Sequence, residues 1–137
     1  MLPRELRSSH NARFRLVYHL VLVTKYRKRV LTAAMLDRAA EILRSLAQAW
    51  EGSVLECSGE PDHLHVLFEV PPKARPSDVV NNMKTVTSRR LRKEFPQLRA
   101  AYRGKPVLWS PSYCILSAGG APIEVLKRYV QAQERPR

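Results

Sequence analysis

The order of predicted elements in this 137-residue chain indicates an α+β fold: a ferredoxin-like βαββαβ antiparallel sheet with an additional C-terminal helix that carries Tyr129. Apolar and polar residues alternate over 63–70, which predicts a half-buried strand. Apolar residues recur at helical spacing over 33–50 and over 78–95, and each of these segments lies between predicted strands. Because this fold hosts many functions, the fold class alone indicates none of them.

The first strand is predicted over residues 13–25. Both of its faces are largely apolar toward its end, which is typical of a central strand. Residues 1–12 are polar and basic and are expected to be loosely ordered. A basic turn follows the strand, formed by Lys25, Arg27, Lys28 and Arg29. This cluster either holds phosphates or is a solvated loop.

The next three elements are a helix and a hairpin. Thr32 is predicted to cap the helix over 33–50, and Gly52 to end it. A strand over 53–58 then pairs with the strand over 63–70 as an antiparallel hairpin, with Pro61 at the turn.

The second half of the chain contains a helix, a strand and a helix. Ser77 is predicted to cap the helix over 78–95, and a loop over 96–106 follows it. The last strand covers 107–117, and Pro111 within it indicates an edge strand or a bulge. A Gly119-Gly120 joint leads to the last helix, over 121–134, where Pro122 suits a first-turn position.

Composition narrows the class of protein. The chain is long enough for one domain, residues 1–137, and 45% of its residues are hydrophobic, which indicates a globular protein. Lys and Arg number 24 against 12 Asp and Glu, and the net charge of +12 favours a polyanionic partner. No apolar run approaches the length of a membrane span, so no membrane association is expected. Two cysteines, Cys57 and Cys114, favour a reduced cytoplasmic protein.

Two stretches contain the candidate chemistry. His63 and His65 lie on the same face of their predicted strand, roughly 6–7 Å apart at ~3.3 Å per residue, so both imidazoles can reach one ion. Tyr129 and Gln133 share one face of the last helix at i and i+4, outside its apolar stripe. The alternatives are two half-exposed histidines of a sheet and an ordinary packing tyrosine. His19 is either a further residue of the site or a structural one.

The second half of the helix over 78–95 is strongly basic, with Arg89, Arg90, Arg92 and Lys93. Such a run is either a solvated face or a contact with the DNA backbone.

Several motifs in order resemble one family. They are Tyr18-His19-Leu20-Val21-Leu22-Val23-Thr24-Lys25-Tyr26-Arg27, Asp62-His63-Leu64-His65, Ser88-Arg89-Arg90-Leu91-Arg92-Lys93-Glu94-Phe95-Pro96, Leu108-Trp109-Ser110, Gly119-Gly120-Ala121-Pro122 and the Tyr129/Gln133 pair. The chain resembles the single-tyrosine HUH transposases, the TnpA enzymes of the smallest bacterial insertion sequences, over most of its length.

The resemblance implies a metal-assisted DNA transposase. Such an enzyme cleaves and rejoins single-stranded DNA at hairpin-bearing element ends through a 5′-phosphotyrosine intermediate. It implies Tyr129 as the nucleophile and His63, His65 and Gln133 as ligands of Mg²⁺ or Mn²⁺. All three ligands are neutral, so the cation keeps its full charge for the scissile phosphate. The DNA-binding candidates are the eight basic residues of the turn and of the helix: Lys25, Arg27, Lys28, Arg29, Arg89, Arg90, Arg92 and Lys93.

Family members act as homodimers in which the tyrosine helix docks on the partner subunit, and the chain leaves a cis or a trans arrangement open. Three alternatives remain. One is a domesticated relative that acts on repeated palindromic sequences. Another is a replication initiator or relaxase, which the short chain disfavours. The third is a non-catalytic nucleic-acid-binding module, but the sheet lacks the Gly/Phe-rich strand on which such modules stack bases.

Overall fold

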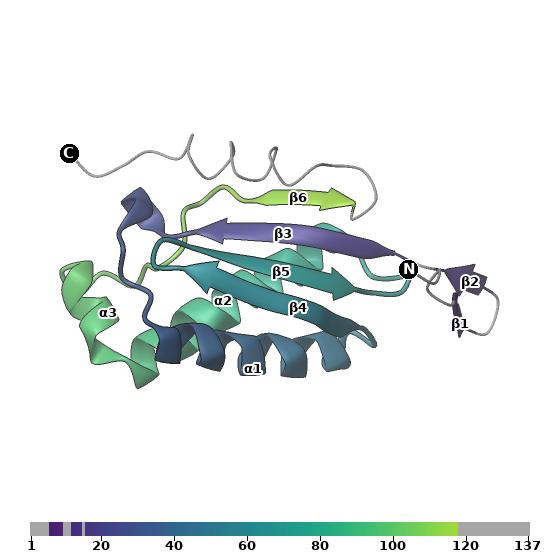
Figure 1. Cartoon of the computed structure of the whole chain (residues 1–137), viewed down its shortest axis with the longest axis horizontal. Coiled ribbons are helices and arrows are strands. Elements are labelled where there is room, and N and C mark those ends of the chain that lie inside the picture. Colours follow the sequence, from purple (N-terminus) through teal and green to yellow (C-terminus); the bar gives the residue numbers. More distant parts are fainter. Residues whose placement is uncertain (1–5, 10–11, 15, 118–137) are drawn as a thin grey trace.

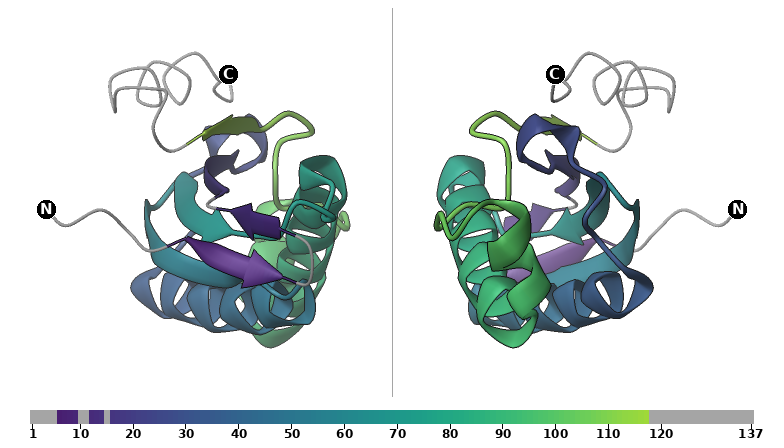
Figure 2. Two further views of the ribbon diagram at one scale, coloured as in Figure 1. Left: turned by 90° about the vertical axis from the view of Figure 1, so that its right-hand side faces the viewer. Right: turned by 90° about the vertical axis from the view of Figure 1, so that its left-hand side faces the viewer.

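The computed structural model describes residues 6–9, 12–14 and 16–117. Four strands form an antiparallel sheet in the order β4 (Ser53–Glu60), β5 (His63–Glu69), β3 (Val17–Val23) and β6 (Cys114–Ser117). The helices α1 (Ala33–Ala49) and α2 (Pro76–Glu94) pack together against one face of this sheet (Figure 1; Figure 2). The strands β1 (Arg7–Ser9) and β2 (Ala12–Phe14) form a separate hairpin. The predicted βαββαβ sheet is confirmed.

The core lies between the sheet and the two helices. Leu20 and Leu22 of β3 and Leu64, Val66 and Phe68 of β5 are fully buried there. The predicted alternation along β5 is therefore correct, because His63 and His65 point to the other face. The predicted central position of β3 is also correct, since it pairs with β5 on one side and with β6 on the other.

The first predicted strand is shorter than expected. It is divided into β2 and β3, and β1 lies within the segment expected to be loosely ordered. Arg7 of β1 connects the small hairpin to the main sheet, because its Nη1 lies 3.1 Å from Oε1 of the buried Glu69. No local pattern in the sequence predicted this long-range ion pair.

Helix α1 begins as predicted. Thr32 is its N-cap, and the Thr32 hydroxyl oxygen accepts a hydrogen bond from the amide of Met35 at 3.2 Å. The helix ends through Glu51, which has a φ of 61°, and the amide of Gly52 donates to the carbonyl of Ala47 at 2.8 Å. Gly52 itself is needed for a close approach, since a Cβ there would lie 2.0 Å from the carbonyl oxygen of Glu69.

The predicted cap of α2 is wrong. The helix starts at Pro76 with Arg75 as N-cap, and Ser77 lies inside the first turn. Proline suits this first position because its φ is already helical and its missing amide hydrogen has no partner to lose. The apolar positions Val79, Val80, Met83 and Leu91 are fully buried, as the helical spacing predicted.

The segment between α2 and the last strand differs most from the prediction. The expected loop over 96–106 contains a short helix, α3 (Pro96–Ala101), which Pro96 starts in the same way. The expected strand over 107–117 is reduced to β6, and Trp109 forms only an isolated bridge with Thr24. The predicted edge position is correct, because β6 is the last strand of the described sheet. The Gly119-Gly120 joint and the helix predicted over 121–134 lie outside the described residues.

Candidate active site

The two histidines of β5 lie side by side on the face of the sheet opposite α1 and α2. In the register of the sheet, His63 is opposite Val23 of β3 and His65 is opposite Val21. Their ring centroids are 4.8 Å apart and the rings are nearly perpendicular, at 85°. The structure therefore brings the two imidazoles together, as the sequence predicted.

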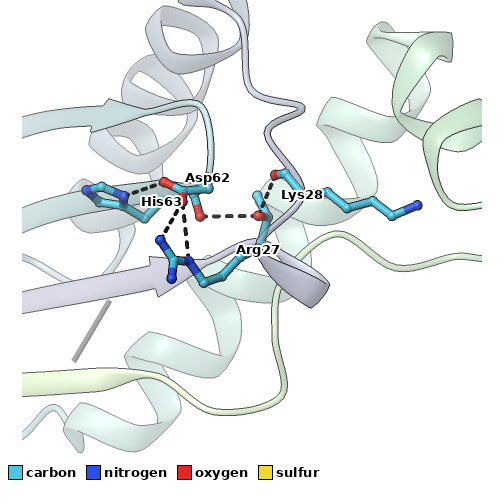
Figure 3. Close-up of polar contacts among 5 residues, drawn as sticks. Arg27, Lys28, Asp62 and His63 are labelled. Atoms are coloured by element: carbon cyan, nitrogen blue, oxygen red, sulfur yellow. Dashed lines mark hydrogen bonds and ion pairs between the residues drawn. The ribbon is translucent and has the colours of Figure 1, made fainter. Parts of the chain in front are cut away.

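The ring of His63 is held by its neighbour in sequence. Its Nδ1 lies 2.8 Å from Oδ1 of the buried Asp62 (Figure 3). Burial alone raises the pKa of Asp62, but the hydrogen bonds and charges of His63 and Arg27 outweigh it and lower this pKa below its usual value. An ionised carboxylate only accepts hydrogen bonds, so Nδ1 carries the proton and the lone pair on Nε2 is available to a ligand.

The ring of His65 is more deeply placed. Burial, with smaller contributions from the charges of His63 and His19, lowers the pKa of His65 to about 4. It is therefore neutral at physiological pH, the form in which imidazole binds metals. Its buried Nδ1 has no hydrogen-bond partner among the described residues. An orphaned buried nitrogen of this kind fits a ligand site, because an unpaired buried polar atom is costly.

Two adjacent imidazoles are suitable donors for a divalent cation, but two ligands do not complete its coordination. Within the described ranges, no group of three or more His, Cys, Asp or Glu side chains is placed to hold a metal ion. A cation here would take further oxygen ligands from elsewhere, such as an amide, water or phosphate. The donor chemistry of the two histidines thus fits a divalent cation that takes its remaining ligands from outside this pair.

A hollow adjoins His65 on this face. It has a volume of about 310 Å³ and is lined by His19, Glu56, Ser58, His65 and Leu67. The ring centroids of His19 and His65 are 6.2 Å apart. His19 therefore faces the site, which the sequence left open.

The basic turn after β3 is the 3₁₀ helix η1 (Lys25–Arg27) with Lys28 and Arg29. The basic side chains of this turn differ in their contacts and in their exposure. The Nζ of Lys28 donates to the carbonyl of Ala101 at 2.6 Å, and Arg27 is paired with Asp62. Arg29 is exposed and Lys25 is half-buried, so these two are more accessible to a ligand.

The basic residues of α2 lie on a helix that packs against the opposite face of the sheet from the histidines. Arg89 and Lys93 are exposed. Arg92 Nε donates to the hydroxyl of Ser88 at 3.1 Å, and Arg90 lies 3.8 Å from Glu94. The structure does not bring these residues together with His63 and His65. Tyr129 and Gln133 lie outside the described residues.

Comparison with known proteins identifies the family. Residues 12–133 match the sequence model of the family described as "Transposase IS200 like". The chain belongs to the IS200-like transposases. It is 32% identical over 133 residues to the ISDra2 transposase TnpA of Deinococcus radiodurans, which covers 97% of this chain and 94% of that protein. It is 29% identical over 113 residues to the transposase for insertion sequence element IS200 of Salmonella typhimurium, covering 82% of this chain and 74% of that one.

One solved structure agrees with this assignment, and a second shares the fold. A crystal structure from Deinococcus radiodurans R1, of a protein assigned to the transposases, superposes with a TM-score of 0.86 at 29% identity, covering 95% of this chain and 99% of that one. A REP-associated tyrosine transposase bound to a REP hairpin shares the fold, with a TM-score of 0.51 at 14% identity over 90% of this chain and 68% of that one. Within the part of the chain that the structure describes, no helix is long and apolar enough to cross a membrane.

Sequence reasoning missed the roles of Asp62 and Arg27 at this site. A local signal existed for Asp62, because an acid directly before a histidine at a strand start can reach the imidazole Nδ1. No signal existed for its pairing with Arg27, which lies 35 residues earlier in the chain.

Proposed function

We propose that this transposase cleaves and rejoins single-stranded DNA at hairpin-bearing ends of an insertion sequence through a 5′-phosphotyrosine intermediate. The observation that supports this most directly is the pair of adjacent imidazoles on the face of β5 opposite α1 and α2, in a chain of the IS200-like family. A pair of adjacent histidines suits a cation that activates a phosphodiester.

Tyr129 is the nucleophile in this proposal. Its phenolic oxygen loses its proton and forms a bond to the scissile phosphorus as the bond to the 3′ oxygen breaks, and the departing 3′ oxygen takes up a proton to become a free 3′-OH. The phosphodiester energy stays in the protein–DNA bond, so the 3′-OH of another strand can reverse the step without ATP. Because hydrolysis would lose this energy, strand transfer is favoured over hydrolysis.

His63, His65 and Gln133 would hold the divalent cation, Mg²⁺ or Mn²⁺. When bound, the cation supplies Lewis-acid polarisation of the scissile phosphate. The carboxylate of Asp62 favours a proton on Nδ1 of His63, which leaves Nε2 as the donor atom, and burial keeps His65 neutral.

The exposed side chains of Arg29, Arg89 and Lys93 and the half-buried Lys25 are the stronger candidates for contacts with the DNA backbone. Arg27 and Lys28 are weaker candidates because the protein itself engages their charged groups. An insertion-sequence element is favoured over a repeated palindrome as the substrate. The relatives named for insertion sequences are 29–32% identical, whereas the hairpin-bound REP-associated relative is 14% identical.

The test is a covalent-capture assay. The full chain is incubated with labelled single-stranded DNA that carries candidate element ends, with Mg²⁺ or Mn²⁺, and resolved on a denaturing protein gel. We expect a DNA-linked band that requires metal, Tyr129, His63 and His65. A band of equal intensity in Tyr129→Phe would remove this tyrosine from the mechanism, and DNA binding without any covalent band would indicate a binding module.

We further propose a homodimer with composite sites, and a subunit-mixing experiment tests it. Tyr129→Phe and His63→Ala are each expected to be inactive. If the tyrosine acts on the partner's histidines, mixing the two variants produces heterodimers with one intact site and restores part of the activity. No recovery after subunit exchange would indicate that each tyrosine works with the histidines of its own chain.

A further inference from the structure

Two consecutive residues of η1 have an unusual backbone conformation. Tyr26 has a φ of 61° and Arg27 has a φ of 52°, and neither is glycine. The left-handed region is unfavourable for side chains with a Cβ, so such residues persist only where their surroundings hold them. Strain of this kind at a candidate site suggests that the position of the turn serves a purpose.

Hydrogen bonds hold this turn from several sides. The buried Thr24 donates through its amide to the carbonyl of Asp62 at 3.0 Å, and its hydroxyl lies 2.7 Å from the carbonyl of Lys28. The amide of Lys25 donates to the carbonyl of Leu108 at 2.8 Å, and the hydroxyl of Tyr102 donates to the carbonyl of Lys25 at 2.9 Å. The turn is thereby tied to the β4–β5 connection that precedes His63.

This arrangement directs the side chain of Arg27 toward the carboxylate of Asp62. Its Nε and Nη2 lie 3.4 and 3.3 Å from Oδ2 of Asp62, and only 8% of each of the two side chains is exposed (Figure 3). The other carboxylate oxygen, Oδ1, is left for Nδ1 of His63 at 2.8 Å. The guanidinium of Arg27 therefore contacts one carboxylate oxygen of Asp62, and the imidazole of His63 contacts the other.

We propose that Arg27 is a positioning residue that acts through Asp62 to fix the ring orientation and the tautomer of His63, and that the strained turn exists to place it. This rests on the proposed metal role of His63. With the carboxylate held by the guanidinium, Oδ1 keeps the proton on Nδ1 and leaves the lone pair of Nε2 for a ligand. Outer partners of this kind orient metal-binding histidines and raise their basicity.

The competing role for Arg27 is a direct phosphate contact, which the basic cluster in the sequence suggested. The geometry disfavours it, because the guanidinium is buried and already engaged by a carboxylate. Arg29, two residues later, is exposed. Arg27→Gln and Arg29→Gln therefore form a matched pair: they remove the same charge from the same turn, and only the first removes the contact with Asp62.

The first measurement uses the metal-free, full-length protein. Nitrogen chemical shifts of the imidazoles, recorded at a pH where His63 is neutral, report which ring nitrogen carries the proton. We expect wild type and Arg29→Gln to show His63 protonated on Nδ1. Arg27→Gln is expected to show a mixture of the two tautomers. An unchanged Nδ1–H tautomer in Arg27→Gln would overturn the proposal, because this readout does not depend on metal, DNA or activity.

The second measurement is the affinity for Mn²⁺, followed by calorimetry or by electron paramagnetic resonance. Loss of such an outer partner weakens metal binding by roughly 10–100-fold, and we expect Arg27→Gln near the lower end of that range. Arg29→Gln should bind Mn²⁺ like wild type. Equal affinities in the two variants would contradict the positioning role.

Two further variants keep the result interpretable. If Arg27→Gln does not fold, Arg27→Lys replaces it, because it retains the ion pair without the two-pronged fork and should show a smaller loss of affinity in the same direction. The double variant His63→Ala/His65→Ala tests the metal site itself. If wild type binds Mn²⁺ no better than this double variant, the proposed metal site fails together with the inference. If wild type does bind better and Arg27→Gln equals Arg29→Gln, only the inference fails.

Discussion

The buried hydrogen bond between Trp109 and Thr87 offers the sharpest test of how the fold supports the site. The indole Nε1 donates to the hydroxyl of Thr87 at 2.9 Å, where Thr87 is fully buried and Trp109 is 7% exposed. The same hydroxyl donates to the carbonyl of Met83 at 2.6 Å. Trp109 also forms the bridge with Thr24. The hydrogen bond between Trp109 and Thr87 therefore connects α2 with the turn that contains Arg27.

The perturbation is Thr87→Val, which keeps the shape of the side chain and removes the acceptor. The indole N–H is then buried without a partner, which costs about 1–3 kcal/mol. The carbonyl of Met83 loses little, because a helix carbonyl also accepts the amide four residues later. We therefore expect the free energy of unfolding to fall by about 1–3 kcal/mol, while Thr87→Ser, which retains the hydroxyl, loses less.

The assay is urea unfolding followed by far-ultraviolet circular dichroism, in a double-mutant cycle with Trp109→Phe. In the Trp109→Phe background no indole N–H remains to be stranded, so Thr87→Val should change stability by less than about 0.5 kcal/mol. An equal loss of stability in both backgrounds would show that the hydrogen bond carries none of the effect, and would refute the reasoning.

Three further predictions concern Gly59 of β4, Lys84 of α2 and His65 of β5. Gly59→Ala places a Cβ 2.6 Å from the carbonyl oxygen of His63 and should lower the free energy of unfolding by about 1–3 kcal/mol in urea titrations; unchanged stability would mean that β4 can shift freely. Lys84 donates to the carbonyls of Ser110 and Pro111 at 2.9 and 3.0 Å, so Lys84→Met should speed hydrogen exchange in β6, with Lys105→Met as an exposed control. The pKa of His65 is about 4 in the folded state, below its ordinary value of 6.5. Between these two pH values the unfolded chain therefore binds more protons than the folded chain. Stability of the metal-free protein should therefore fall as the pH drops from 6.5 toward 4, and His65→Gln should lose less; equal losses would contradict the burial of this ring.

Local patterns predicted much of the fold. The alternation along β5, the buried stripe of α1 and its Thr32 cap were each readable from a few neighbouring residues, because the period of side-chain burial follows directly from backbone geometry. The errors fell where two local signals compete. Pro96 starts a short helix where its position after a long helix suggested a loop, and Pro76 begins α2 one residue before the serine expected to cap it.

For the candidate site, the sequence by itself determined that His63 and His65 share one face of a strand, since residues two apart in a strand always do. It also determined the excess of positive charge that favours a nucleic-acid partner. It did not determine which basic side chains are available to such a partner. Arg27 and Arg29 look alike in the sequence, yet one is buried against Asp62 and the other is exposed. Only the tertiary structure decided this, because the left-handed turn at Tyr26 and Arg27 and the carboxylate that it faces come from segments 35 residues apart.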